Sequence, residues 1–230
     1  MTTPMIVSIE GNIGCGKTTL INNLEIHLKN SNITNIRVLR EPVDIWNEMI
    51  DSNDDENILT KFYNDKTKFA FSFQILVLKS VLETIIQCIE KYPDCEVIIC
   101  ERSVLSSRHI FTKMLYDDSY MNEIEYKIYE SLFDNWVNSS VFTPQKFIFL
   151  NVLPETSIQR IIRRNRTGES RITKDYIVSC GLYHRLWFES IENAAVLTIN
   201  SNEDVTYDLE DNNNIGLVWI KQILSHIDMK

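Results

Sequence analysis

Five short apolar runs recur along the chain, separated by longer segments in which polar and apolar positions mix. Each run is continuous rather than alternating and is rich in β-branched or aromatic residues, which is typical of strands buried on both faces. The connections are long enough for crossovers, so the pattern predicts an α/β fold with a five-stranded, mostly parallel sheet flanked by helices. The predicted strands are Met5–Glu10, Ile36–Arg40, Val97–Cys100, Phe147–Leu150 and Val196–Ile199.

Helical patterns fill the connections. The longest covers about Tyr63–Tyr92, and another helix is expected to begin near Ser103. The remaining helices are predicted over about Thr18–Lys29, Met121–Asn138, Glu155–Arg166, Lys174–Asn193 and Ile215–Ile227. Polar loops are predicted at Asp51–Glu56, Tyr116–Ser119 and Asp208–Asn214. We find no repeat, linker or shift in composition, so residues 1–230 are expected to form a single domain.

The composition is that of a soluble globular protein, with 44% hydrophobic and 24% charged residues. The net charge of -9 disfavours binding to nucleic acid or to an anionic membrane, because the field of the protein repels phosphate. We identify no apolar stretch long enough to span a bilayer, and the N-terminus does not read as a targeting segment. Five cysteines without a C-x-x-C pair fit a reducing compartment. These features together predict a cytoplasmic protein.

A phosphate-binding motif follows the first predicted strand. Gly11-Asn12-Ile13-Gly14-Cys15-Gly16-Lys17-Thr18, continued by Thr19, matches G-x-x-x-x-G-K-[ST] between a strand and a helix. Glycines allow the backbone to wrap phosphates, and the helix N-terminus supplies partial positive charge. Lys17 would add a full charge, and Thr18 could ligate Mg²⁺. The motif predicts binding of a nucleoside triphosphate. The chain has no Asn-Lys dipeptide for a guanine-reading N-K-x-D motif, so a small kinase is favoured over a GTPase.

Two carboxylates follow predicted strands at the edge where the phosphate loop lies. Glu41 comes directly after the second strand and Glu101 after the third. In an open parallel sheet the carboxyl ends of the strands line the ligand crevice. The sequence therefore predicts an acidic site there that could position Mg²⁺, with Arg102 able to stabilise the transferring phosphoryl group.

The only dense basic run is Arg160-Ile-Ile-Arg-Arg-Asn-Arg166. It stands out from an acidic chain and follows the fourth strand. Arginine suits phosphate because its planar fork bonds two oxygens at once. We expect an arginine-rich lid over about residues 160–172, with a solvated helix face as the alternative.

At this point the sequence resembles the deoxyribonucleoside kinases of the thymidine kinase 2, deoxycytidine kinase and insect deoxynucleoside kinase type. The motifs that carry the resemblance keep their order over about residues 5–205. They are Ile9-Glu10-Gly11-Asn12-Ile13-Gly14, Glu41-Pro42-Val43 with Trp46, Phe73-Gln74, Glu101-Arg102-Ser103-Val104, Pro154-Glu155-Thr156, and the arginine segment ending at Glu169. The resemblance implies a P-loop kinase fold, ATP and Mg²⁺ as cofactors, a deoxyribonucleoside substrate, and a homodimer formed near Met121–Asn138.

The resemblance also implies roles for individual residues. Glu41 resembles the acid that accepts the proton of the sugar 5′-OH, and Arg102 the arginine beside it. Glu101 resembles the partner acid near Mg²⁺. Gln74 resembles the base-reading amide between the aromatic walls Phe73 and Phe111, with Trp46 closing the pocket. Tyr63 and Glu169 resemble the pair that binds the 3′-OH. The remaining positions implied are the lid arginines Arg160, Arg164 and Arg166, the adenine loop at Glu203, Asp204 and Val205, and Val77 in the base pocket.

The base preference follows from a departure from the family pattern. Members that favour deoxycytidine or purines carry an Arg and an Asp where this chain has Val81 and Ser107. An amide can match thymine in one orientation and cytosine in the other, so Gln74 alone does not discriminate. We expect Val81 and Ser107 to line an uncrowded base pocket that accepts thymidine.

Two other functions are compatible with the phosphate loop. A thymidylate-type monophosphate kinase would share the fold and the lid, although Glu41 would repel the phosphate of its acceptor. A catalytically silent nucleotide-binding subunit would be expected to lose some of Lys17, Glu41, Glu101 or Arg102, and all four are present.

Overall fold

The computed structural model describes residues 3–137, 141–165 and 171–228. Five strands form one parallel sheet in the order β2-β3-β1-β4-β5. The strands are β1 Met5–Gly11, β2 Ile36–Leu39, β3 Val97–Glu101, β4 Lys146–Asn151 and β5 Val196–Asn200. All five predicted strands are confirmed, with boundaries that differ by at most two residues.

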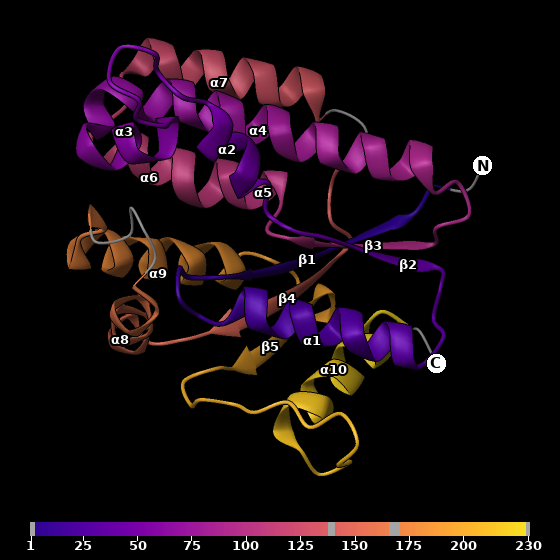
Figure 1. Cartoon of the computed structure of the whole chain (residues 1–230). Coiled ribbons are helices and arrows are strands. Elements are labelled where there is room, and N and C mark those ends of the chain that lie inside the picture. Colours follow the sequence, from indigo (N-terminus) through magenta and orange to yellow (C-terminus); the bar gives the residue numbers. More distant parts are fainter. Residues whose placement is uncertain (1–2, 138–140, 166–170, 229–230) are drawn as a thin grey trace.

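Helices cover both faces of the sheet (Figure 1). On one face α1 (Lys17–Asn30) and α10 (Ile215–His226) pack against Val7, Ile9 and Ile99 in one core cluster. On the other face α4 (Lys66–Lys91) covers Ile6 and Ile98. Apolar side chains therefore leave each central strand in both directions, which explains why the runs in the sequence do not alternate.

The predicted helix Tyr63–Tyr92 is wrong at its N-terminal end. The helix is interrupted at Asp65, whose φ of -143° and ψ of 84° are not helical. The Asp65 side chain accepts a hydrogen bond from Lys68 N and so caps the start of α4. Residues before the break form α3 (Ile58–Asn64), and Val43–Glu48 forms α2. Both are too short to give a clear helical period, and we did not predict either.

The helix expected near Ser103 begins there but is not regular. Ser103 caps α5 (Val104–Ser106), and the chain then passes through the π-helical segment η1 (Ser107–Thr112) into α6 (Lys113–Asp117). A capping box of Ser103 and Ser106 fixes the start. The π-helical turn had no recognisable signal in the sequence.

The remaining helices lie close to their predicted positions. They are α7 Glu123–Trp136, α8 Pro154–Arg164 and α9 Lys174–Glu189, with a 3-10 turn η3 at Asn193–Ala195 before β5. The predicted C-terminal ends at Asn138 and Arg166 lie outside the described residues. Helix α9 ends at Glu189, before the predicted Asn193. There Ser190 N donates to Trp187 O, three residues back, which closes the last turn of the helix.

One expectation about membranes needs correction. Within the described residues, α4 is long and apolar enough to cross a bilayer by length and composition alone. Such a helix is weak evidence of a membrane span, because the core helix of a soluble protein passes the same test. Here α4 packs against α3, α7 and η1, and it supplies residues to three core clusters. Its hydrophobicity is explained by this packing.

Candidate functional site

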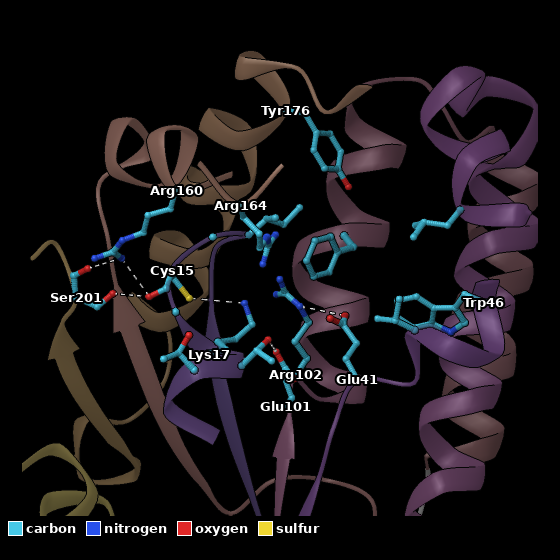
Figure 2. Close-up of a pocket in the computed structure, with 18 of the residues that line it drawn as sticks. Cys15, Lys17, Glu41, Trp46, Glu101, Arg102, Arg160, Arg164, Tyr176 and Ser201 are labelled. Atoms are coloured by element: carbon cyan, nitrogen blue, oxygen red, sulfur yellow. Dashed lines mark hydrogen bonds and ion pairs between the residues drawn. The ribbon is translucent and has the colours of Figure 1, made fainter. Parts of the chain in front are cut away.

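A cavity of about 870 Å³ opens at the carboxyl ends of the strands. The phosphate loop and the start of α1 form one wall, and α2, α3 and α4 form the opposite wall (Figure 2). Such a crevice is where open parallel sheets bind ligands. Its lining includes these predicted site residues: Ile13, Gly14, Cys15, Gly16, Lys17, Thr18, Thr19, Glu41, Trp46, Tyr63, Phe73, Gln74, Val77, Glu101, Arg102, Phe111, Arg160, Arg164, Glu203, Asp204 and Val205.

The phosphate loop has the backbone that a close wrap around an anion requires. Gly14 and Gly16 have φ of 80° and 103°, in the left-handed region that favours glycine. A Cβ on Gly14 would lie 2.8 Å from Ser157 O of α8. Lys17 Nζ donates to Gly11 O and Asn12 O at 3.0 Å each, so its ammonium is held within the loop.

Two predicted loop residues, Gly11 and Asn12, do not line the cavity. Their hydrogen bonds instead hold the loop in place. Gly11 O accepts from Lys17 and also from Arg102 Nη1 at 3.1 Å. Asn12 Nδ2 donates to Ile177 O at 2.9 Å, and Asn12 Oδ1 accepts from Ile13 N at 2.8 Å. The asparagine therefore ties the loop to α9.

Two acids and one arginine meet beside the loop, as Figure 2 shows. Glu41 Oε1 lies 3.2 Å from Arg102 Nε, and the Arg102 guanidinium lies 4.7 Å above the Phe111 ring. Glu101 Oε1 accepts from Thr18 Oγ1 at 2.8 Å. The structure thus brings Glu41, Glu101 and Arg102 together in the lining of one cavity.

The backbone of Arg102 is strained. Its φ of 64° is left-handed, which costs a non-glycine residue on the order of 1–3 kcal/mol and is most often found at functional sites. Arg102 N donates to Ile9 O at 3.0 Å, which anchors the turn directly after β3. The side chain is 7% exposed and is held in the cavity wall by Glu41 and Gly11.

The charges of this group are coupled. Burial raises the pKa of Glu41; neighbouring Arg102 opposes this shift and Glu101 adds to it. Burial alone would lower the pKa of Arg102, but Glu41 and Glu10 raise it above its ordinary value. The arginine therefore stays charged, and Glu41 is a stronger base than an ordinary carboxylate.

Glu10 is a buried acid that we did not assign a role. It lies at the end of β1 with no exposed surface, and its Oε1 accepts from Ser8 Oγ at 2.6 Å and Ser103 Oγ at 2.7 Å. Among the described residues no group bonds to its Oε2. Glu10 thus joins the phosphate-loop strand to the turn that carries Arg102. Its signals in the sequence were an acid at the end of a mostly apolar strand and its place in the motif that continues into the phosphate loop.

The far wall is aromatic. Phe73 lies edge-on to Trp46 at 5.4 Å between ring centroids and is tilted against Phe62 at 4.8 Å. Trp46 Nε1 donates to Ser80 Oγ at 2.9 Å, which fixes the indole on α4. Tyr176 of α9 also lines the cavity, and sequence analysis missed it because it follows no recognised motif.

Val81 and Ser107 do not line this cavity, contrary to the prediction. Val81 lies one helical turn beyond Val77 and packs into the core against a cluster that includes Ile98. Ser107 is buried behind Gln74, to which its hydroxyl donates. The part of the cavity wall beside Gln74 is therefore formed by other residues.

The basic segment makes different contacts from those expected. Arg160 bonds Ser201 O and Glu203 O at 2.8 Å each and Asp204 Oδ1 at 3.1 Å, so it holds the loop after β5. Arg163, which we did not select, pairs with Asp204 at 2.7 Å and lines the cavity with Arg164. Ser201, also unselected, donates to Cys15 O at 2.7 Å. The predicted residues Arg166 and Glu169, and most of the expected lid after Arg164, lie outside the described residues.

Comparison with known proteins identifies the family to which this arrangement belongs. The family model for deoxynucleoside kinases matches residues 7–225. The chain belongs to the deoxynucleoside kinase family. It is 31% identical to human deoxycytidine kinase over 86% of this chain and 84% of that protein. The mouse deoxycytidine kinase is 30% identical over 95% of this chain and 90% of its own length.

A viral relative is also similar. Protein 029R of Invertebrate iridescent virus 3, a kinase by name, is 32% identical over 85% of this chain and 88% of that protein. Membership identifies the chain as an ATP-dependent deoxynucleoside kinase with a P-loop kinase fold, which phosphorylates a nucleoside. The resemblance seen in the sequence is thereby confirmed.

The site is compatible with ATP and with a magnesium ion. The loop offers backbone donors, Lys17 and the N-terminus of α1 to phosphates, and Thr18 Oγ1 and Glu101 Oε1 lie together at 2.8 Å beside it. The described residues contain no cluster of three or more acidic, His or Cys ligands that could hold a metal. This is compatible with Mg²⁺, which usually takes one or two protein ligands together with substrate phosphates and water.

Proposed function

We propose that this kinase transfers the γ-phosphoryl group of ATP to the 5′-OH of a pyrimidine deoxyribonucleoside and that thymidine is among its substrates. The observation that carries the proposal is the Glu41–Arg102 pair at the cavity wall between the phosphate loop and the aromatic wall. A neutral hydroxyl acceptor needs a base beside it, and a carboxylate paired with an arginine fits that need.

In this proposal Glu41 takes the proton of the 5′-OH as the new P–O bond forms. Arg102 stabilises the negative charge that develops on the transferring group, together with Lys17. Mg²⁺ held by Thr18 and Glu101 would neutralise phosphate charge. Phe73 and Phe111 would stack on the base, and Gln74 would read its edge.

The alternative of a thymidylate-type monophosphate kinase is less well supported. Its acceptor carries a phosphate, and the carboxylate of Glu41, which lines the cavity, would repel that anion. A catalytically silent subunit is also less well supported, because Lys17, Glu41, Glu101 and Arg102 are all present.

Further parts of the proposal concern the donor side, the assembly and the compartment. Arg160, Arg164 and Arg166 would serve a lid, with Glu203, Asp204 and Val205 at the adenine. We propose one domain, a cytoplasmic location and a homodimer through α7. Support for the dimer is that Ile124, Ile128 and Trp136 of this helix are 72%, 44% and 41% exposed.

Transfer from ATP and Mg²⁺ to thymidine, deoxycytidine, deoxyadenosine, deoxyguanosine and dTMP, compared side by side, tests this function. The proposal predicts nucleoside monophosphates, with thymidine used no more than tenfold less efficiently than deoxycytidine by kcat/KM. Transfer to dTMP alone would establish the monophosphate kinase instead. A thymidine efficiency more than tenfold below that of deoxycytidine would contradict the assigned base preference.

A further inference from the structure

Four polar side chains form a buried cluster at the base-facing end of the cavity. They are Gln74 of α4, Ser107 and Thr112 of η1, and Tyr129 of α7, and none is more than 3% exposed. Ser107 Oγ and Thr112 Oγ1 each donate to Gln74 Oε1 at 3.3 Å. Ser107 Oγ also lies 2.9 Å from Tyr129 Oη. Burial raises the pKa of Tyr129 to about 12, and the neighbouring Ser107 and Thr112 hydroxyls act in the opposite direction. We call these three hydroxyl residues the hydroxyl cluster; of the four side chains, only Gln74 lines the cavity.

The π-helical turn brings the cluster together. Ser107 and Thr112 are five residues apart, and in an α-helix that spacing would place them about 140° apart around the axis. A π-helix closes its hydrogen bonds between residues five apart, so its first and sixth residues lie on one side. Both hydroxyls therefore reach the same amide oxygen. Single π-helical turns are frequent at functional sites, which directs attention to Gln74.

The chemical type of the cluster matters for what Gln74 can recognise. The amide has an acceptor at Oε1 and a donor at Nε2. Cytosine presents an amino donor where thymine presents the O4 acceptor, so the two bases need opposite orientations of the amide. A carboxylate beside Gln74 would only accept and a guanidinium would only donate, and either would favour one orientation. A hydroxyl both donates and accepts.

We propose that Ser107, Thr112 and Tyr129 are positioning residues that hold the Gln74 amide in either of two orientations, so that this kinase accepts both thymidine and deoxycytidine. The inference rests on the proposed function, because Gln74 must face the base. It adds the means by which one site serves two opposite hydrogen-bonding edges.

Proton accounting shows that both orientations can be satisfied. In the first, Ser107 and Thr112 donate to Oε1, and Tyr129 Oη donates to Ser107 Oγ. In the second, Nε2 donates to Ser107 Oγ, Ser107 donates to Tyr129 Oη, and Tyr129 donates to Thr112 Oγ1. Thr112 then gives its proton to a backbone carbonyl of the preceding turn, as helical threonines do. The second arrangement depends on the Tyr129 hydroxyl, whereas the first does not.

The test compares kcat/KM for thymidine with kcat/KM for deoxycytidine in the same enzyme preparation. This ratio does not depend on how much of a variant is folded, so a purely structural role would leave it unchanged. Tyr129→Phe removes the hydroxyl that the second arrangement needs, and Thr112→Val removes one donor of the first. Tyr126→Phe is the matched control, because it lies on the same helix and stacks on Tyr116 instead.

We expect Tyr129→Phe to change the ratio by at least about fivefold, close to the usual net contribution of one hydrogen bond. Thr112→Val is expected to change it in the opposite direction, and Tyr126→Phe to leave it within twofold of the wild type. Ratios within twofold for both cluster variants, while the wild type phosphorylates both nucleosides, would overturn this inference alone. A wild type that phosphorylates neither nucleoside would contradict the proposed function itself.

Discussion

At the scale of single residues, the site depends on charged side chains that are largely removed from solvent. Glu41 and Arg102 contact each other at the cavity wall, and each shifts the pKa of the other. A carboxylate in this position is a better proton acceptor than one in water, because burial disfavours its charged form. The backbone of Arg102 is strained, so the contacts that hold its side chain in place must offset the conformational cost.

The pH dependence of kcat follows from the raised pKa of Glu41. The base must be ionised to accept a proton, so kcat falls as the pH drops through that pKa. Because burial raises the pKa, the fall is expected to begin at a higher pH than an ordinary glutamate would give. Steady-state rates with saturating ATP and thymidine between pH 5 and 9 measure this limb. A kcat that is still close to its maximum at pH 5, as an ordinary glutamate pKa of 4.5 would allow, would argue against Glu41 as the base.

Glu10 gives a separate prediction about stability. Burial raises the pKa of Glu10, so the folded state binds more protons than the unfolded state. The free energy of unfolding therefore falls as the pH rises from the ordinary glutamate pKa through the raised pKa of Glu10. Glu10→Gln removes that titration. The difference in melting temperature, variant minus wild type, should therefore become more positive between pH 5 and 9. Glu48→Gln, at the exposed end of α2, is the control. A difference independent of pH would show that Glu10 keeps its ordinary pKa.

The residues that the sequence could identify were those with a motif or a strand end to mark them. Lys17, Glu41, Glu101 and Arg102 follow from the phosphate loop and from the rule that strand ends meet at one edge. Tyr176 and Ser201 come from a helix and a loop whose positions depend on packing, so nothing local marked them. Val81 was wrongly predicted to line the cavity. It lies one helical turn beyond Val77, which does line the cavity, and that turn moves its side chain into the core.

At the scale of elements, the phosphate loop is held between α1, α8 and α9. Gly14 lies against the carbonyl of Ser157 in α8, and Asn12 binds the backbone of α9. Strands were predictable because burial on both faces gives unmistakable apolar runs. The break at Asp65 and the π-helical turn were not, since tertiary packing rather than local propensity decides them.

Gly14→Ala tests how closely the loop fits its neighbours. The new Cβ would lie 2.8 Å from Ser157 O and 3.0 Å from Ile161 Cγ1, and φ of 80° is unfavourable for alanine. The loop or α8 must shift, so the KM for ATP is expected to rise about tenfold or more. The free energy of unfolding is expected to fall by about 1–3 kcal/mol. Initial rates as a function of ATP concentration measure the KM, and urea unfolding measures the free energy of unfolding. Unchanged values of both would show that the loop can hold a methyl group at residue 14.

At the scale of the whole molecule, one sheet separates two packed layers. Helices α1 and α10 build the core on one face, while α4 and α7 build the core on the other (Figure 1). The cavity opens at the carboxyl ends of the strands. The five-stranded parallel architecture was predictable from run spacing alone. The backbone path of residues 41–65, which form much of the far wall of the cavity, was not predictable from the sequence.

The exposed apolar residues of α7 predict the assembly. Ile124→Glu places a charge in the proposed dimer interface, so light scattering after gel filtration is expected to show a monomer where the wild type is a dimer. Ile26→Glu is the control, because Ile26 is an exposed isoleucine on α1, away from the proposed interface. A monomeric wild type, or an Ile124→Glu protein that remains dimeric, would contradict this interface.

The most direct test of the account is the formation of thymidine 5′-monophosphate from ATP and thymidine by the wild type, Glu41→Gln and Glu48→Gln. The account predicts product with the wild type and with Glu48→Gln, and a kcat lower by about 10²–10⁴-fold with Glu41→Gln, the usual contribution of a general base. A Glu41→Gln protein that forms the product at the rate of the wild type would contradict the central claim that Glu41 takes the 5′-OH proton.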